Sequence, residues 1–294
     1  MLKRNSKETL YGFIALIPAL VLFLMFTYYP LTSTFQYSFT NWDGFARTYQ
    51  NIGFENFIKS FSDPELKNAF GNTIYFASIS VLIGTVLQIS FALLLFHKFR
   101  GKNFFRALFY LPCVISQLVA SLTWLVFFQY TGVINEFLVS IGLEEFVKNW
   151  LGDVNAVKNV LIFINLWQWT GYGMVIYLAG LTAIPQDVYE SAKIDGATGF
   201  KQFFSITLPL LMPAVTINLF VGITGGLKVF DLPFVLTKGG PIGASQMLSM
   251  EIYNNAFTYE RFGYASAIGV EFFVFIAAIT IVQLILTRRK EVEY

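Results

Sequence analysis

The sequence has 294 residues, of which 55% are hydrophobic and 18% aromatic, while only 13% are charged. Soluble domains carry about 25% charged residues, so this composition excludes an ordinary soluble domain and is typical of a membrane protein. The net charge of +2 gives no reason to expect a nucleic-acid partner. With one histidine and one cysteine, Cys113, the chain cannot form an intrachain disulfide and lacks the residues for most metal or catalytic sites.

Apolar stretches of about 20 residues, each long enough to cross a hydrocarbon core of about 30 Å, recur along the chain. They predict an all-α membrane protein with six transmembrane helices and a single domain over residues 1–294. The first is interpreted as a retained helix, because no small-residue cleavage site follows it. The predicted spans are 10–29, 73–96, 107–130, 159–184, 208–227 and 264–287.

The distribution of lysine and arginine predicts how these spans are oriented. Basic residues are concentrated before the first span, between the second and third, in the connection 185–207 and after the sixth. Such loops stay on the cytoplasmic side of a membrane. We therefore expect both termini and the 185–207 connection to be cytoplasmic in a multi-pass protein of the plasma (inner) membrane.

The 185–207 connection carries charged residues between two apolar spans and has the pattern of two short helices. Pro185 suits a first helical position, and Gly196 is placed to end that helix in a left-handed conformation. Thr198 is a candidate cap for a second helix. Its expected apolar face consists of Phe200, Phe203 and Phe204.

This connection resembles the EAA loop of permease subunits of ABC importers. The resemblance rests on Glu190, Ser191, Ala192, Asp195, Gly196 and Ala197, followed by Ile206, Leu208 and Pro209. Ser191 stands where the middle alanine is usual. A second and separate match is that the segments 38–45, 52–76 and 231–245 resemble external segments of carbohydrate-type, MalF-like permeases.

The resemblance implies a type I ABC importer permease fold in which 185–207 is the coupling loop, seated on a cytoplasmic ATPase subunit. The implied partners are a second homologous permease subunit, two copies of the ATPase subunit, an extracellular solute-binding protein and the lipid bilayer. The candidate ATPase-coupling residues are Glu190, Ser191, Ala192, Asp195, Gly196, Ala197, Phe203, Leu208 and Pro209.

The chain has no phosphate-binding loop of its own. The glycines and the lysine of residues 196–201 lack the GK[ST] order that cradles phosphate. We therefore expect a transport subunit without an ATPase site, which binds no cofactor or metal, with ATP and magnesium held by the partner ATPase subunits.

A stripe of polar and aromatic residues marks the fourth predicted span. Asn165, Gln168, Trp169 and Tyr172 are spaced to share one helix face. Amide groups can bond sugar hydroxyls, and aromatic faces can contact the C–H patches of a sugar. In the resembling maltose-type permeases the substrate-contacting residues of this helix fall at about these places. The alternative for all four is interhelical packing with hydrogen bonds.

Other candidates for the substrate pathway are Asn218, Gly226, Lys228 and Glu271. Lys228 has the alternative of an ion pair with Asp231. Glu271 is the charged residue of the sixth span, and intramembrane carboxylates are costly unless they have a function or a partner. It could bind substrate, pair with Lys228, be protonated, or reach a hydrated cavity or the interface.

Three functions remain open at this point. The first is the permease subunit of an ABC importer for a sugar, with an oligosaccharide favoured. The second is a stand-alone secondary carrier or channel for a small polar solute, although no inverted repeat is found. The third is an intramembrane enzyme such as a serine protease, which needs a base beside a nucleophile, whereas the one histidine, His97, lies at the end of a span.

Overall fold

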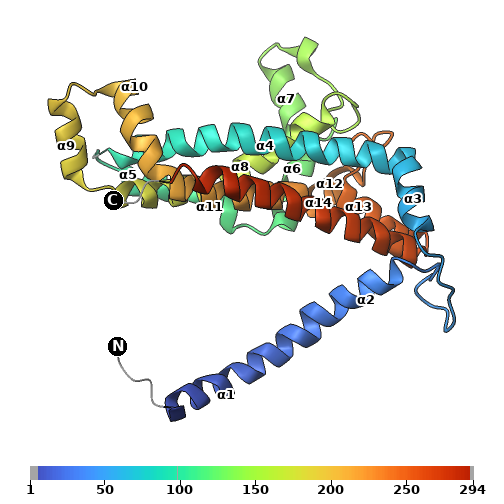
Figure 1. Ribbon diagram of the computed structural model, residues 1–294. Coiled ribbons are helices and arrows are strands. Elements are labelled where there is room, and N and C mark those ends of the chain that lie inside the picture. Colours follow the sequence, from blue (N-terminus) through green and yellow to red (C-terminus); the bar gives the residue numbers. More distant parts are fainter. Residues whose placement is uncertain (1–5, 98, 292–294) are drawn as a thin grey trace. The chain divides into compact units, whose positions relative to one another are not determined.

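The computed structural model describes residues 6–97 and 99–291, with side chains from residue 15 onward. These residues are helical apart from connections and one isolated bridge between Thr40 and Asn51. The elements, labelled in Figure 1, are α1 (Ser6–Phe23), η1 (Leu24–Tyr28), α2 (Tyr29–Tyr37), α3 (Glu55–Ser62), α4 (Pro64–Phe96), α5 (Lys102–Val114), α6 (Gln117–Phe128), α7 (Val133–Ser140), η2 (Glu144–Phe146), α8 (Val157–Ala183), α9 (Gln186–Ile194), α10 (Gly199–Gln202), η3 (Phe203–Thr207), α11 (Leu208–Leu227), α12 (Asp231–Thr237), α13 (Leu248–Tyr253), η4 (Asn254–Thr258) and α14 (Phe262–Arg288).

Five helical stretches of the described chain are long and apolar enough to cross a membrane. They overlap the first, second, third, fifth and sixth predicted spans. The fourth predicted span is the 27-residue helix α8, whose amide and indole side chains lower its hydropathy. The five stretches are Ala15–Tyr37, Pro64–Phe96, Gln117–Ser140, Gly199–Thr237 and Phe262–Arg288.

The third predicted span, 107–130, is wrong as a single helix. The chain is helical in α5 up to Val114, extended at Ile115 and helical again from Gln117. Pro112 contributes no backbone N–H to α5, and the hydroxyl of Ser116 accepts the N–H of Val119 as the N-cap of α6. The sequence therefore codes a break inside a continuous apolar run.

The other span boundaries differ from the prediction mainly in length. Helix α4 begins at Pro64 instead of residue 73, because proline at a first helical position costs no hydrogen bond. The first span continues through a π-helical turn into α2 and ends at Tyr37 instead of residue 29. Helix α11 runs through Gly225 and Gly226 and ends at Leu227.

The described chain forms two compact units, residues 6–63 with 252–273 and residues 64–251 with 274–291. In the second unit α8 packs against α4, α5 and α11. One cluster of buried residues joins these helices. Its largest members are Met174, Tyr177, Leu181 and Leu211.

Helix α8 approaches α5 closely at Gly171. A Cβ added to this glycine would lie 1.9 Å from the carbonyl oxygen of Phe109 and 2.5 Å from its carbonyl carbon. These neighbours are backbone atoms, so they cannot move aside as a side chain would. Glycine is therefore required at this position for the observed packing of α8 on α5.

The first unit is held together by one buried amide and by aromatic contacts. The amide nitrogen of Asn56 donates to the carbonyl oxygens of Ser38 and Thr40, at 2.9 Å each. The indole ring of Trp42 packs against the rings of Tyr37 and Phe262. These contacts fix α3 against the loop that follows α2 and the first turn of α14.

Candidate functional site

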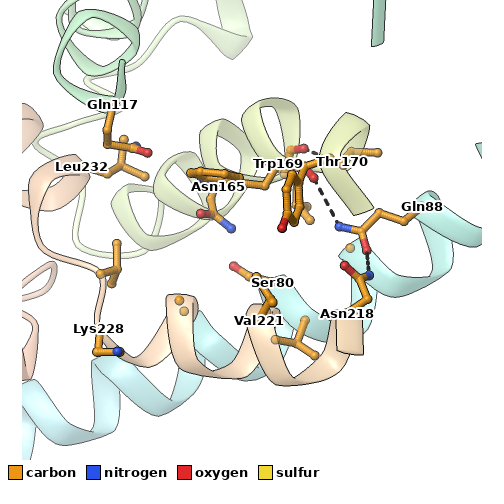
Figure 2. Close-up of a pocket in the computed structure, with 18 of the residues that line it drawn as sticks. Ser80, Gln88, Gln117, Asn165, Trp169, Thr170, Asn218, Val221, Lys228 and Leu232 are labelled. Carbon is orange, nitrogen blue, oxygen red and sulfur yellow. Dashed lines mark hydrogen bonds between the residues drawn. The ribbon is translucent and has the colours of Figure 1, made fainter. Parts of the chain in front are cut away.

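A cavity of about 290 Å³ lies among α4, α8 and α11. Figure 2 shows its polar lining, with Asn165 and Trp169 of α8 directed toward the space in front of Ser80 of α4. The volume is close to the lower end of that of ligand pockets, about 300 Å³. Of the predicted pathway residues, the structure brings six together in this lining: Asn165, Trp169, Tyr172, Asn218, Gly226 and Lys228.

Two aromatic rings and one amide of α8 form one wall of the cavity. Trp169 is 40% exposed although it lies in the middle of a packed helix. The rings of Trp169 and Tyr172 meet edge to face, with their centres 6.0 Å apart. Asn165 lies one turn before Trp169. The wall therefore offers aromatic surfaces beside an amide group that has no hydrogen-bond partner among the described residues.

Gln168 does not belong to this wall, in contrast to the prediction for the stripe. It is 1% exposed, and its amide nitrogen donates to the carbonyl oxygen of Ile115 at 3.0 Å. That carbonyl belongs to the extended residue between α5 and α6. The packing alternative therefore fits Gln168, because its side chain satisfies backbone left unpaired by the helix break.

Glu271 is also absent from the lining of this cavity. Within the first unit its carboxylate accepts a hydrogen bond of 2.7 Å from the hydroxyl of Ser60. Ser60 lies 211 positions earlier in the chain. This partner does not follow from the sequence, because nothing in the residue pattern of either segment links Ser60 to Glu271.

Gln88, which is not among the residues predicted from the sequence, links three helices at the cavity. Its amide oxygen accepts from the Asn218 amide nitrogen at 2.6 Å, and its own nitrogen donates to the Trp169 carbonyl at 3.4 Å (Figure 2). Gly173 leaves the room for this side chain, since a Cβ there would lie 2.2 Å from the Gln88 amide carbon. The available signal was a glutamine within an apolar span. Other lining residues that were missed are Ser80, Thr85 and Gln117.

Lys228 and Asp231 both line the end of the cavity where α11 meets α12. The predicted ion pair between them is not formed in the described part of the chain. Both side chains are exposed. The lining therefore carries one cation and one carboxylate that are accessible to a solute.

The 185–207 connection has the predicted two-helix form, with corrections at both starts. Pro185 is the N-cap of α9 and not its first helical residue. Thr198 is at the N-cap of α10, but its hydroxyl makes no capping hydrogen bond. The helix that follows turns from α to π at Phe203, so Phe200, Phe203 and Phe204 do not form a regular α-helical stripe.

The turn after α9 is closed by backbone hydrogen bonds. Gly196 has a φ of +75°, the left-handed conformation predicted for it. Its N–H donates to the Lys193 carbonyl at 3.1 Å, and the N–H of Ala197 donates to the Ala192 carbonyl at 2.8 Å. Both alanines are buried. Small residues are therefore needed where the helix end folds back on itself.

The other candidate coupling residues are divided between an exposed face and the segment from η3 to the start of α11. Glu190, Ser191 and Asp195 are exposed, and Glu190 accepts a hydrogen bond from Gln186. Ile194 and Phe200 beside them are 87% and 85% exposed. Phe203, Leu208 and Pro209 are half-buried. The exposed face combines carboxylates with large apolar side chains, a composition that fits a protein-binding surface.

Residues 80–292 match the family of binding-protein-dependent transport system inner membrane components. The chain belongs to this family. It is therefore a multi-pass transport component of the membrane, with the type I ABC importer permease fold.

Relatives of this permease match it over nearly its whole length. A probable ABC transporter permease, YurN of Bacillus subtilis, is 35% identical over 95% of this chain and 96% of its own. The multiple sugar-binding transport system permease MsmF of Streptococcus mutans is 33% identical over 98% and 99%. The trehalose/maltose transport system permease MalF of Thermococcus litoralis is 34% identical over 96% and 95%.

Solved structures agree with this assignment. A chain of a bacterial ABC transporter that imports the acidic polysaccharide alginate superposes with a TM-score of 0.84 and 26% identity, over 96% of both chains. A second structure of a bacterial alginate ABC transporter contains the periplasmic protein with a bound alginate pentasaccharide. It superposes with a TM-score of 0.80 and 26% identity, over 96% of this chain and 93% of that one.

The link through Gln88 gives a first testable prediction. Gln88→Leu and Asn218→Leu should each lower the melting temperature of the purified permease, because each leaves a polar partner unpaired among the helices. The double variant should lose less than the sum of the two. The coupling energy expected for one interhelical hydrogen bond in a membrane protein is about 0.6 kcal/mol and at most about 1.7 kcal/mol. Strictly additive losses in thermal unfolding would show that the two amides do not interact.

Proposed function

We propose that this permease moves a sugar, preferably an oligosaccharide, across the plasma membrane, driven by ATP hydrolysis in partner subunits. The observation that carries the proposal is the cavity of the second unit, where Trp169 and Tyr172 lie beside Asn165 and Asn218. The names of the relatives for multiple sugars and for trehalose and maltose, and the alginate importer, support the same substrate class.

The chemistry of the lining suits a sugar in two ways. The faces of Trp169 and Tyr172 can cover the apolar C–H patches of a pyranose ring. The amide of Asn165 can donate to and accept from hydroxyl groups, because no described partner occupies it. Lys228 at the end of the cavity adds a cation that an acidic sugar derivative would contact.

In the proposed assembly, the energy that drives transport is supplied by partner subunits and not by this chain. The permease pairs with a second homologous permease, two ATPase subunits that hold ATP and magnesium, and an extracellular solute-binding protein. The termini and the 185–207 coupling loop are cytoplasmic. The exposed carboxylates and apolar side chains of that loop contact the ATPase, so that nucleotide binding shifts the equilibrium between two cavity orientations.

Uptake by the reconstituted complex tests this function. Proteoliposomes that contain the whole importer are supplied with its binding protein and labelled sugars, with and without ATP. Asn165→Leu and Tyr172→Leu should reduce sugar uptake strongly, while Phe163→Leu on the exposed face of α8 should leave it near wild type. Sugar flux through this permease in the absence of any ATPase subunit would favour the stand-alone carrier instead.

A further inference from the structure

Helix α3 has its polar and apolar faces reversed relative to a helix on the surface of a soluble protein. Asn56 and Ser60 are buried, with 7% and 3% of their surfaces exposed. Phe54 at its N-cap, Ile58 and Phe61 are 66%, 68% and 74% exposed and lie on one face. A surface helix in water turns its apolar face inward. The reversal indicates that the outward face of α3 is not in water.

The buried face of α3 is fixed by specific hydrogen bonds. The Asn56 amide bridges the carbonyl oxygens of Ser38 and Thr40, and the Ser60 hydroxyl donates to the Glu271 carboxylate at 2.7 Å. Rotating the helix to hide its phenylalanines would take these partners away from the buried Asn56 amide and from the Glu271 carboxylate, which is costly. The exposure of the apolar face is therefore enforced by the contacts on the opposite side.

The contact with Glu271 sets the depth of α3 along the sixth span. Glu271 follows Phe262, the first residue of α14, by nine positions, which is roughly 13 Å along the helix axis. A hydrocarbon core takes about 20 helical residues, and counting back from Thr287, next to Arg288 at the other end, reaches Ile268. Glu271 thus lies about one turn inside the hydrocarbon edge, and Ser60 reaches that depth.

Besides the ring contacts of Phe54 and Phe57 with Phe39, α3 and its C-cap have two polar contacts with Tyr264 of α14. The Lys59 ammonium lies 4.7 Å from the ring centre of Tyr264, and the Tyr264 hydroxyl donates to the Asp63 carboxylate at 2.9 Å. Tyr264 is buried, but Lys59 is exposed, and lysine extends its charge toward the membrane–water interface. One edge of α3 therefore faces the head groups while its apolar face is level with the start of the hydrocarbon.

We propose that α3 is an interfacial helix, with Phe54, Ile58 and Phe61 among lipid acyl chains in the leaflet around the N-terminal end of α14. Glu271 is its anchor within the membrane, which gives this carboxylate a role away from the substrate cavity. Such a contact with lipid does not depend on which solute the permease transports.

Spin labels on α3 test the contact with lipid. In a Cys113→Ala background, Ile58→Cys and, separately, Glu55→Cys are labelled in the full importer in phospholipid nanodiscs. Glu55 lies on the same helix, is exposed and belongs to its polar side. The label at 58 should collide more often with oxygen, which dissolves in acyl chains, than with a water-soluble nickel chelate. The label at 55 should show the opposite order.

Two results would overturn the proposal. Nickel access at position 58 equal to that at 55 would place the face in water. Exclusion of both reagents from position 58 would mean that another protein surface covers it. The anchor is tested with the same label: Glu271→Leu removes the hydrogen bond that joins Ser60 to α14 and should raise nickel access at 58, whereas Glu271→Gln keeps an amide acceptor for Ser60 and should not. Unchanged access in both variants would remove Glu271 from the proposal.

Discussion

Gly171→Ala is expected to prevent the permease from accumulating as a folded protein. The added methyl group would lie 1.9 Å from the Phe109 carbonyl oxygen, so α5 and α8 would have to separate. Extra volume in a packed interior costs about 1–3 kcal/mol, and contacts with rigid backbone belong at the upper end of that range. The loss is measured as the yield of monodisperse protein in detergent and as a fall in its melting temperature.

Gly225→Ala provides the matched control for this prediction. Both glycines lie within apolar helices, but a Cβ at Gly225 meets no atom within 4 Å among the described residues. Its yield and melting temperature should equal or slightly exceed those of the wild type, since alanine favours helix over glycine by about 1 kcal/mol. Equal behaviour of the two variants would mean that α8 does not approach α5 as the structure shows.

The spans illustrate which parts of this fold follow from sequence alone. The length of the apolar stretches predicted where the membrane helices lie, because a helix must reach a minimum length to cross a bilayer. It failed between Val114 and Gln117, where the helix break depends on Pro112 and a capping serine hidden in an apolar run. Hydropathy indicates whether a segment lies in a membrane or in water, but it contains no information about such local hydrogen bonds.

The candidate site was predictable to the extent that it lies on one helix. The α-helical period correctly placed Asn165, Trp169 and Tyr172 on one face of α8. Gln168 shares the spacing but points to Ile115, and Gln88 joins the site from another helix. Both outcomes depend on which helices are neighbours, and a single sequence without an alignment does not contain that information.

Glu271 is a second case in which the sequence does not show which segments are neighbours. Its position in an apolar span made it a functional candidate by default. In the structure its partner is Ser60. Ser60 lies on α3, the short helix that follows the aromatic-rich loop after α2. A charge in a membrane needs a compensating contact, and that contact can be architectural. The chemistry of one residue therefore predicts that a partner exists, but not which partner it is.

Gly196→Val is expected to uncouple the permease from its ATPase while leaving the membrane helices folded. The glycine has a φ of +75°, and a Cβ added to it would meet no atom within 4 Å in the described chain. The free energy cost of a side chain here therefore comes from the backbone conformation alone and not from a clash. A left-handed conformation costs an ordinary residue roughly 1–2 kcal/mol, which is a factor of about 5–30 in the population of the native turn. Sugar uptake and substrate-stimulated ATP hydrolysis should fall together by a factor in that range.

Gly196→Asn separates this explanation from a general intolerance of side chains at the turn. Asparagine adopts the left-handed conformation more readily than valine, and the open space around Gly196 accommodates either residue. The asparagine variant should therefore keep most of the uptake, and both variants should melt at the wild-type temperature, because the turn lies outside the packed helices. If valine and asparagine reduced coupling equally, the conformation of the turn would not be the property that the ATPase requires. If neither reduced it, the 185–207 loop would not transmit the movement, and the coupling surface would have to lie elsewhere on the cytoplasmic side of this permease.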